Sequence, residues 1–343
     1  MPSQDWQDYP LVIFHVFGGC CSNAFSLEAL LKDNPGLGSA LTFSQLLFIA
    51  AQALPSFLRL APWPRLKPRN VPIRLWIMQV MLLTSVSLLN NWAFQFRVPL
   101  ALLILIRSAG LVVAMCIGYL FLNKKYTSTQ VIAVIIVSVG VVLATLSRPT
   151  APQTPLVDPD IPSVGDPSTV LYIIGVSMLA FSLVLSGILG ALQERTFAEY
   201  GPHWQEGVFY THALSVPIFA FLLPEVKRGL RDSLVSPSPT GVLKMSGTST
   251  FFVLLLNLTS QSICVKSVNK LTTRMSSVSA NLILTARKAL SLCLSVWWFG
   301  DGWNMGMTIG AALVFLGSIV YAFDGKGMAK QEVNGMAREA KNK

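Results

Sequence analysis

STQVIAVIIVSVGVVLATLSRPTAPQTPLVDPDIPSVGDPST, residues 128–169, is the stretch that decides how this chain folds. Residues 128–146 are apolar almost without interruption, and their number is close to the ~20 residues with which a helix crosses a bilayer. Residues 148–169 are rich in proline and carry several aspartates, a composition typical of flexible linkers. The stretch therefore predicts the end of one group of membrane helices and a link to a second group.

Apolar spans continue in both directions from this linker, five before it and five after it. The predicted spans are Leu11–Leu30, Ala40–Leu58, Leu75–Phe96, Val98–Leu122, Ser128–Leu146, Val170–Leu192, Val208–Leu223, Phe251–Val268, Val278–Phe299 and Met305–Phe323. Hydrophobic residues make up 52% of the chain and charged residues 12%, about half the charged fraction of a soluble domain. These features exclude soluble, disordered and fibrous proteins, and the spans are too long for barrel strands. The sequence predicts an all-α polytopic membrane protein with ten transmembrane helices.

The distribution of Lys and Arg predicts the orientation. If the N-terminus is cytosolic, the cytosolic links hold more than twice as many basic residues as the opposite links, among them Lys67, Lys124 and Arg274. Under the positive-inside rule both termini are then cytosolic, the number of spans is even and the linker is luminal. The N-terminus is acidic where a signal peptide would be basic, so we expect the first span to remain as a signal anchor. The basic links explain the net charge of +10 without nucleic-acid binding.

The linker divides the chain into a first five-helix repeat (1–147) and a second one (170–323), followed by a basic cytosolic tail (324–343). An odd number of spans per half forces the second half to insert upside down, the inverted-repeat arrangement of secondary carriers, whose sites lie near the midplane. The halves also echo each other, since Arg107 and Arg287 each precede a turn and a glycine-bearing final helix. Rows of small residues favour helix packing within the chain, with a homodimer contact as the alternative.

Three basic side chains lie well inside predicted spans: Arg107 in the fourth, and Arg287 and Lys288 in the ninth. Each costs about 2.5–3.5 kcal/mol at a helix centre, so it should face a wet cavity or a partner. The spans hold no Asp or Glu at the midplane, and Glu28, near the end of the first span, comes closest. We therefore expect a positive cavity that binds an anion, with an internal ion pair to Glu28 or contacts to backbone carbonyls as the alternative.

Polar side chains follow helical faces around these charges. They are Asn23 in the first span, Asn90 and Asn91 in the third, Asn257 and Gln261 in the eighth, and Asn281 and Thr285, which share a face with Lys288, in the ninth. Four polar faces can line one cavity, although each amide could instead join two helices. The seventh span adds Tyr210, whose ring could stack on a nucleobase or serve core packing, and His212, which could be an ordinary interior histidine.

The sequence predicts no catalytic centre, metal site or cofactor, because it lacks Walker A, HExxH and GxSxG motifs and any cluster of metal ligands. The cysteines all lie in apolar stretches without a CxxC pair, so we expect neither a disulfide framework nor a zinc site. They are Cys20, Cys21, Cys116, Cys264 and Cys293. The glycosylation pattern at Asn257 lies inside a span and is not expected to be used.

Six segments, taken together and in order, resemble nucleotide-sugar transporters of the drug/metabolite transporter superfamily. They are FGGCCSNAFSLEALLKDNPG, LTFSQLLFIA, NNWAF, RSAGLV, FYTHALSVP and LTARKALSL. The resemblance extends from about Phe17 to Asp324, and is greater to the subgroup that carries UDP-N-acetylglucosamine and UDP-xylose across endoplasmic reticulum or Golgi membranes. It implies ten helices with both termini in the cytosol.

The resemblance also implies two binding motifs. In GDP-mannose carriers a Phe-Tyr-Asn-Asn run on the seventh helix lies at the base, and here Thr211 and His212 replace the two asparagines, which fits a uridine reader better. Tyr210 would then stack on uracil or bond to it. A Gly-Ala-Leu-Asn-Lys run on the ninth helix meets ribose and phosphate. Its counterpart ends in Arg287 and Lys288, and the arginine in place of asparagine should strengthen diphosphate binding.

We therefore expect an antiporter that carries UDP-N-acetylglucosamine into the lumen of the endoplasmic reticulum or Golgi in exchange for UMP. Arg287, Lys288 and Arg107 would hold the diphosphate, while the amides of the first, third and eighth spans would meet ribose and sugar hydroxyls. The alternatives among carriers are UDP-xylose, another nucleotide sugar or a sugar phosphate. The alternative of another class is a membrane-embedded glycosyl transferase, against which the lack of an Asp/His catalytic set argues.

Overall fold

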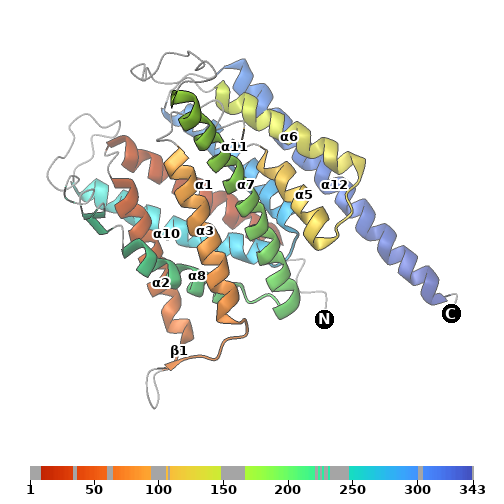
Figure 1. Cartoon of the computed structure of the whole chain (residues 1–343), viewed down its shortest axis with the longest axis horizontal. Coiled ribbons are helices and arrows are strands. Elements are labelled where there is room, and N and C mark those ends of the chain that lie inside the picture. Colours follow the sequence, from red (N-terminus) through yellow and green to blue (C-terminus); the bar gives the residue numbers. More distant parts are fainter. Residues whose placement is uncertain are drawn as a thin grey trace. The chain divides into compact units, whose positions relative to one another are not determined.

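The computed structural model describes residues 9–33, 37–59, 65–93, 106, 109–147, 167–220, 223–224, 226–227, 231, 247–299 and 304–341. Almost all of them are helical (Figure 1). The long helices are α1 (Tyr9–Asp33), α2 (Gly38–Phe57), α3 (Ile73–Ala93), α5 (Gly110–Leu122), α6 (Ser128–Leu146), α7 (Pro167–Tyr200), α8 (Trp204–Ala220), α10 (Gly247–Thr272), α11 (Ser277–Phe299) and α12 (Met305–Lys341). A two-stranded antiparallel hairpin, β1 (Leu58–Arg59) and β2 (Arg65–Leu66), follows α2.

Each predicted span coincides with at least part of one of these helices. Within the described residues, seven helices contain a stretch long and apolar enough to cross a membrane: α1, α2, α3, α6, α7, α10 and α12. α5 is a shorter apolar helix. α11 carries Arg287 and Lys288, which lower its hydropathy. The prediction of an all-α polytopic membrane protein is therefore confirmed, with the small hairpin as an addition, while ten crossings in an inverted repeat remain a prediction.

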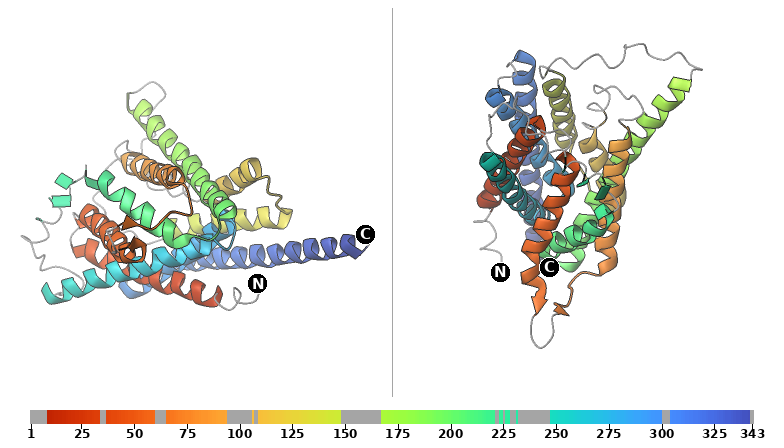
Figure 2. Two further views of the ribbon diagram at one scale, coloured as in Figure 1. Left: turned by 90° about the horizontal axis from the view of Figure 1, so that it is seen from below. Right: turned by 90° about the vertical axis from the view of Figure 1, so that its left-hand side faces the viewer.

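Two helices extend beyond their predicted bounds. α7 begins at Pro167, inside the predicted linker, and continues to Tyr200, past the predicted end at Leu192. Proline is favoured in the first turn of a helix because its missing N–H would find no helical partner there. α12 continues through the predicted tail to Lys341 and is one unbroken helix up to the C-terminal end (Figure 2). Residues 148–166 of the predicted linker lie outside the described part of the chain.

The link between α5 and α6 is short because both helix ends are capped locally. Asn123 takes a left-handed conformation with φ of 51° directly after α5, which asparagine tolerates better than most residues. Thr127 and Gln130 then form a capping box at the start of α6, in which each side chain bonds the other residue's backbone N–H at 3.1 and 3.3 Å. The fourth and fifth predicted spans are thus joined as a tight helical hairpin.

One compact unit, here unit 1, consists of residues Met1–Thr84 and Leu192–Ser276. In its described part α1 lies along α10, α2 lies against α8, and α10 also contacts α2 and α8. Its buried aromatic cluster combines Val71, Trp76, Phe197, Phe209 and Tyr210. Trp76 lies at the start of α3, Phe197 near the end of α7, and Phe209 and Tyr210 near the start of α8. Val71 belongs to the α2–α3 link, so the cluster packs around this link.

The other compact unit, unit 2, consists of Ser85–Ala191 and Ser277–Lys343. Its most extensive contact pairs α6 with α12, which lie side by side in Figure 1. The two helices are antiparallel, because the Asn304 amide donates to the Ser147 carbonyl at one end while the Thr127 hydroxyl donates to the Asp324 carboxylate at the other. Gly310 permits this approach, since a Cβ there would lie 2.4 Å from the backbone nitrogen of Ala144.

Each unit combines segments from both sides of the predicted linker. Unit 1 holds the first, second, seventh and eighth predicted spans, and unit 2 holds the fourth, fifth, ninth and tenth. α3 and α7 each contribute to both units, with the boundary between Thr84 and Ser85 in α3 and between Ala191 and Leu192 in α7. One of the rows of small residues is a GxxxG row formed by Gly306 and Gly310 on α12. Gly310 lies against Ala144 of α6 and Gly306 against Ser147 directly after it, so this row serves packing within the chain.

Candidate functional site

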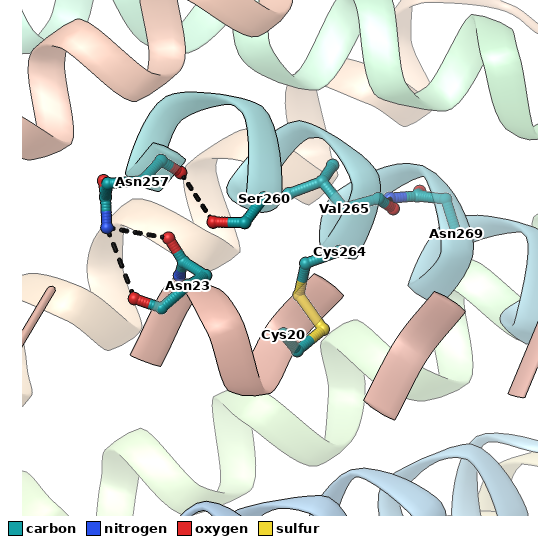
Figure 3. Close-up of a disulfide and its surroundings, with 7 residues drawn as sticks. All are labelled: Cys20, Asn23, Asn257, Ser260, Cys264, Val265 and Asn269. Atoms are coloured by element: carbon teal, nitrogen blue, oxygen red, sulfur yellow. Dashed lines mark hydrogen bonds between the residues drawn. A yellow bond between two sulfur atoms is a disulfide. The ribbon is translucent and has the colours of Figure 1, made fainter. Parts of the chain in front are cut away.

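A polar seam joins α1, α2 and α10 within unit 1. The Asn257 side chain is fully buried, and its Nδ2 donates to Asn23 Oδ1 at 3.0 Å (Figure 3). The same Nδ2 also donates to Ser26 Oγ at 3.1 Å. Its Oδ1 accepts from Gln45 Nε2 at 2.7 Å. Two residues predicted for the site, Asn23 and Asn257, therefore lie together. All polar atoms of the Asn257 amide are used between helices, so a ligand that meets this amide must replace one of these bonds.

A disulfide lies one turn away from this seam and corrects the sequence analysis. Cys20 of α1 is bonded to Cys264 of α10, with their Cα atoms 4.7 Å apart (Figure 3). We had expected no disulfide because cysteine spacing gave no signal. The two residues are 244 positions apart in sequence, and what brings them together is the packing of α1 along α10. In the described chain Cys21, Cys116 and Cys293 are free thiols.

The aromatic run of α8 is held tightly in unit 1. Tyr210 is 6% exposed, and its ring lies 5.0 Å from the Phe209 ring and 6.5 Å from the Phe57 ring, both edge-to-face. The Arg69 guanidinium lies 6.0 Å from the same ring centroid. The ring is therefore part of a packed cluster, and a base that stacks on it must displace one of these neighbours.

His212 lies two residues further along α8 and is less buried than Tyr210. Its Nδ1 lies 2.7 Å from the Val208 carbonyl oxygen one turn earlier. A neutral ring that donates from Nδ1 to this carbonyl keeps Nε2 as the atom that can accept from a ligand. Thr211 beside it donates its hydroxyl to the Gly207 carbonyl at 2.6 Å. Both residues that replace the asparagines of the related motif are thus anchored on their own helix.

The basic pair of the ninth span lies on α11 in unit 2. Leu282, Ala286 and Ala289 form the buried face of this helix. Lys288 is exposed and Arg287 is half-buried beside it. Asn281 and Thr285 are also half-buried, and the Thr285 hydroxyl donates to the Asn281 carbonyl at 2.8 Å. The face predicted to carry Asn281, Thr285 and Lys288 therefore lies away from the buried face.

The other residues predicted for the site are Asn90, Gln261, Asn91 and Arg107, and only some of them lie in the described part of the chain. Asn90 on α3 donates to the Val86 carbonyl at 2.7 Å, and its Oδ1 accepts from Ser182 of α7 at 3.3 Å. It therefore joins two helices within unit 2. Gln261 is half-buried, one turn after Asn257 on α10. The side chain of Asn91 and the whole of Arg107 lie outside the described residues.

Sequence reasoning missed Lys266 as a candidate. It was counted with the cytosolic basic residues, but it lies inside the apolar stretch Phe251–Thr272 of α10. Its Nζ donates to Gln52 Oε1 at 2.7 Å, and the Ser262 hydroxyl donates to the same oxygen. The signal was available, because Lys266 precedes the end of the span that we predicted. Unit 1 therefore has a cation within a helix that is long and apolar enough to cross a membrane.

Comparisons with known proteins identify the family. The model of the UAA transporter family matches residues 9–325. The UDP-N-acetylglucosamine transporter yea4 of Schizosaccharomyces pombe is 35% identical over 94% of this chain and 97% of its own length. The UDP-xylose and UDP-N-acetylglucosamine transporter of Danio rerio is 33% identical over 89% and 91%, and the human nucleotide sugar transporter SLC35B4 is 32% identical over 94% and 96%.

A solved crystal structure shares the fold. It superposes with a TM-score of 0.59 and 18% identity, and covers 93% of this chain and 97% of that one. The family match extends over nearly all of the described helices, and the curated relatives are carriers and not enzymes, which removes the glycosyl transferase alternative. The suspected kinship with nucleotide-sugar transporters is thus confirmed, and this chain belongs to the UAA transporter family.

Proposed function

We propose that this protein is an antiporter that carries UDP-N-acetylglucosamine into the lumen of the endoplasmic reticulum in exchange for UMP. The observation that carries the proposal is the exposed Lys288 beside Arg287 on α11, inside a predicted span. Cations within a membrane helix are costly unless they meet water or an anion. A nucleoside diphosphate supplies such an anion. The names of the relatives from Schizosaccharomyces pombe and Danio rerio support the choice of sugar.

An inverted repeat of ten crossings would place this site between the two halves. Support comes from the helix pairs within the units: α2 with α8, α5 with α11 and α6 with α12. These are the second and seventh, fourth and ninth, and fifth and tenth predicted spans. A twofold relation that exchanges each span with the one five positions later maps each pair onto itself. It also maps the α1–α10 pair onto α3–α7, which are joined by the bond from Ser182 to Asn90.

The proposed contacts to the base, the diphosphate and the sugar follow the sequence motifs and the polar helix faces. We propose that Tyr210 or His212 meets uracil, and that Arg107 joins Arg287 and Lys288 at the diphosphate. The remaining amides and the Thr285 hydroxyl would bind ribose and sugar hydroxyls. They are Asn23, Asn90, Asn91, Asn257, Gln261 and Asn281. Because Asn23, Asn257 and Asn90 already bond neighbouring helices, we propose that Gln261 makes the direct contact on its helix.

The direction of transport follows from the orientation that we propose. The basic bias of the links supports cytosolic termini and a luminal linker. Sugar nucleotides would then enter from the cytosolic side, and the endoplasmic reticulum membrane is proposed as the location, with the Golgi as the alternative. The rows of small residues that we describe are used within the chain, so a homodimer contact would have to use another surface.

A competition experiment tests the substrate. Purified protein in proteoliposomes preloaded with UMP should take up labelled UDP-N-acetylglucosamine, and unlabelled UDP-N-acetylglucosamine, UDP-xylose, GDP-mannose and UMP are added in turn. We expect UMP and UDP-N-acetylglucosamine to compete and GDP-mannose to have no effect. The name of the Danio rerio relative favours UDP-xylose as the second substrate. Uptake of labelled UDP-xylose without uptake of labelled UDP-N-acetylglucosamine would replace the sugar in the proposal, and competition by GDP-mannose would remove uridine specificity.

A further inference from the structure

A pocket of ≈ 540 Å³ lies in unit 1 where α2 ends and α3 begins. It is lined by residues 66–72 of the α2–α3 link together with Tyr200 at the end of α7 and Tyr210 near the start of α8. Among the described residues that line it, Lys67 and Arg69 are charged and none is acidic. The pocket therefore presents two cations and two phenol rings, and it belongs to a different unit from α11.

The link that lines the pocket is fixed by backbone pairing. The hairpin pairs Leu58 with Leu66, and the Lys67 N–H donates to the Phe57 carbonyl at 2.8 Å. The Lys67 ammonium donates to the Ser56 carbonyl at 2.6 Å, a favourable contact because the last carbonyls of a helix carry partial negative charge. These bonds fix the position of Lys67 in the pocket lining, although its side chain is exposed.

The far side of the link is held by a buried carboxylate. Glu206 in the first turn of α8 is 3% exposed and accepts from the backbone N–H of Asn70 at 3.1 Å, from the Asn70 side chain at 3.3 Å and from the Val71 N–H at 3.3 Å. These bonds direct the carboxylate to the link backbone, and Glu206 is not among the lining residues. A ligand in the pocket thus meets Lys67 and Arg69 without meeting the Glu206 carboxylate.

The second cation is positioned by an aromatic ring. Arg69 lies over the Tyr210 ring, with 6.0 Å from the guanidinium carbon to the ring centroid, a cation–π contact. The Tyr210 ring is itself held by Phe57 and Phe209. A guanidinium placed in this way can offer its N–H donors to a phosphate as paired hydrogen bonds, while Lys67 adds a second charge.

We propose that this pocket binds the phosphate group of a phosphate-bearing ligand through Lys67 and Arg69. A basic residue that only sets the orientation of the chain in the membrane has to lie in the link, but it does not have to line a pocket. These two also line a pocket whose wall is fixed by a buried carboxylate and an aromatic cluster. The phosphate can belong to a soluble nucleotide or to a phospholipid headgroup. The proposal does not depend on which sugar the carrier moves. Because Tyr210 is also the proposed base contact, the test uses Lys67 and Arg69 instead.

Lysine labelling with pyridoxal 5′-phosphate tests the proposal directly. Its aldehyde condenses with an amine, borohydride fixes the adduct, and mass spectrometry of peptides reports each lysine separately. The full-length protein is labelled in phosphatidylcholine nanodiscs, with Lys125, an exposed residue of the α5–α6 link, as the internal control. We expect Lys67 to react faster than Lys125. Arg69→Gln should slow labelling of Lys67 by about fivefold, as the loss of one charge-assisted bond implies, and leave Lys125 unchanged.

Competitors then identify the source of the phosphate. Protection of Lys67 by UMP and pyrophosphate, but not by uridine, supports a site for soluble phosphates. Protection by phosphatidic acid in the nanodisc, with no effect of UMP, supports a headgroup site. Equal labelling of Lys67 and Lys125, insensitive to every competitor and to Arg69→Gln, overturns the proposal. The readout requires no transport, so a failed uptake assay with intact labelling would count against the proposed function alone.

Discussion

Lys288 is exposed on α11 while Ala286 and Ala289 on either side of it are buried. Lys288→Ala should therefore abolish uptake of UDP-sugar without unfolding the protein. The melting temperature without ligand should stay level or rise, because removal of a membrane cation removes its insertion cost. UMP should no longer raise the melting temperature, which differential scanning fluorimetry measures. Lys288→Arg should retain part of the activity.

Lys125→Ala, in an exposed link, is the matched control and should behave as the wild type. Full stabilisation of Lys288→Ala by UMP would show that this lysine is not the anion site. Arg287→Ala provides the second measurement. It should give the same loss of uptake and of UMP stabilisation if both cations meet the diphosphate.

Single residues also show where sequence reasoning succeeds. The shared face of Asn281, Thr285 and Lys288 could be predicted because their spacing of four and three residues is set by the helix itself. The bond between Asn257 and Gln45, and the contact of Lys266 with Gln52, could not. They depend on which helices become neighbours, and no local pattern carries that information.

Among the helix pairs, α6 and α12 have the most extensive contact. A substitution of Gly310 tests this contact. A Cβ at this position would lie 2.4 Å from the Ala144 nitrogen on α6. Gly310→Ala should therefore lower the melting temperature, with an overpacking cost of about 1–3 kcal/mol. Gly18→Ala on α1 is the control, because a Cβ there meets nothing within 4 Å and alanine favours helix by about 1 kcal/mol. A Gly310→Ala protein more stable than the wild type would contradict the α6–α12 contact.

The disulfide makes a second prediction about a helix pair. Cys20→Ser should lower the free energy of unfolding, by about 2–4 kcal/mol if it resembles typical disulfides, because α1 is then no longer tied to α10. Cys21→Ser, which removes the adjacent free thiol, is the matched control and should have little effect. Dithiothreitol should lower the melting temperature of the wild type to that of Cys20→Ser. A wild type that is insensitive to the reductant, with unchanged mobility on non-reducing gels, would show that the two thiols are not bonded.

The ends of the elements were predicted less well than their existence. Ten apolar stretches are recognisable because a bilayer requires each of them to be long. The hairpin after α2 was not predicted, because two residues per strand leave no periodic pattern. Nor was the extension of α7 to Tyr200, since outside the apolar stretch its helix is specified by polar residues and by contacts such as Gln79 with Thr196.

At the scale of the whole molecule, the two compact units cut across the halves that the linker defines. Unit 1 takes residues from both sides of the linker, Met1–Thr84 and Leu192–Ser276. The linker divides the sequence into two predicted five-helix repeats, and these repeats are a different division from the compact units. The observed division arises because helices of one half pair with helices of the other, and such long-range pairing has no signature in composition or spacing.

Exchange is the prediction that concerns the whole carrier. Closing the empty site would remove water from Arg287 and Lys288, and removing water from a cation costs several kcal/mol. Closing it around a phosphate replaces that water with charge-assisted bonds. Uptake of UDP-N-acetylglucosamine should therefore be fast into vesicles preloaded with UMP and slow into empty vesicles. Equal initial rates into both would contradict exchange, and vesicles loaded with uridine provide the control for phosphate.

The bond between Cys20 and Cys264 also has a consequence for biosynthesis. At about 5–20 residues per second, the ribosome needs on the order of 10–50 s to extend the chain by the 244 positions from Cys20 to Cys264. Throughout that interval Cys20 is an unpaired thiol next to Cys21, on a helix already in the membrane. The covalent bond can close only after α10 has been inserted beside α1. A chain that contains the disulfide has therefore already placed its eighth span beside the first. A chain that stops at an earlier stage of assembly lacks the disulfide.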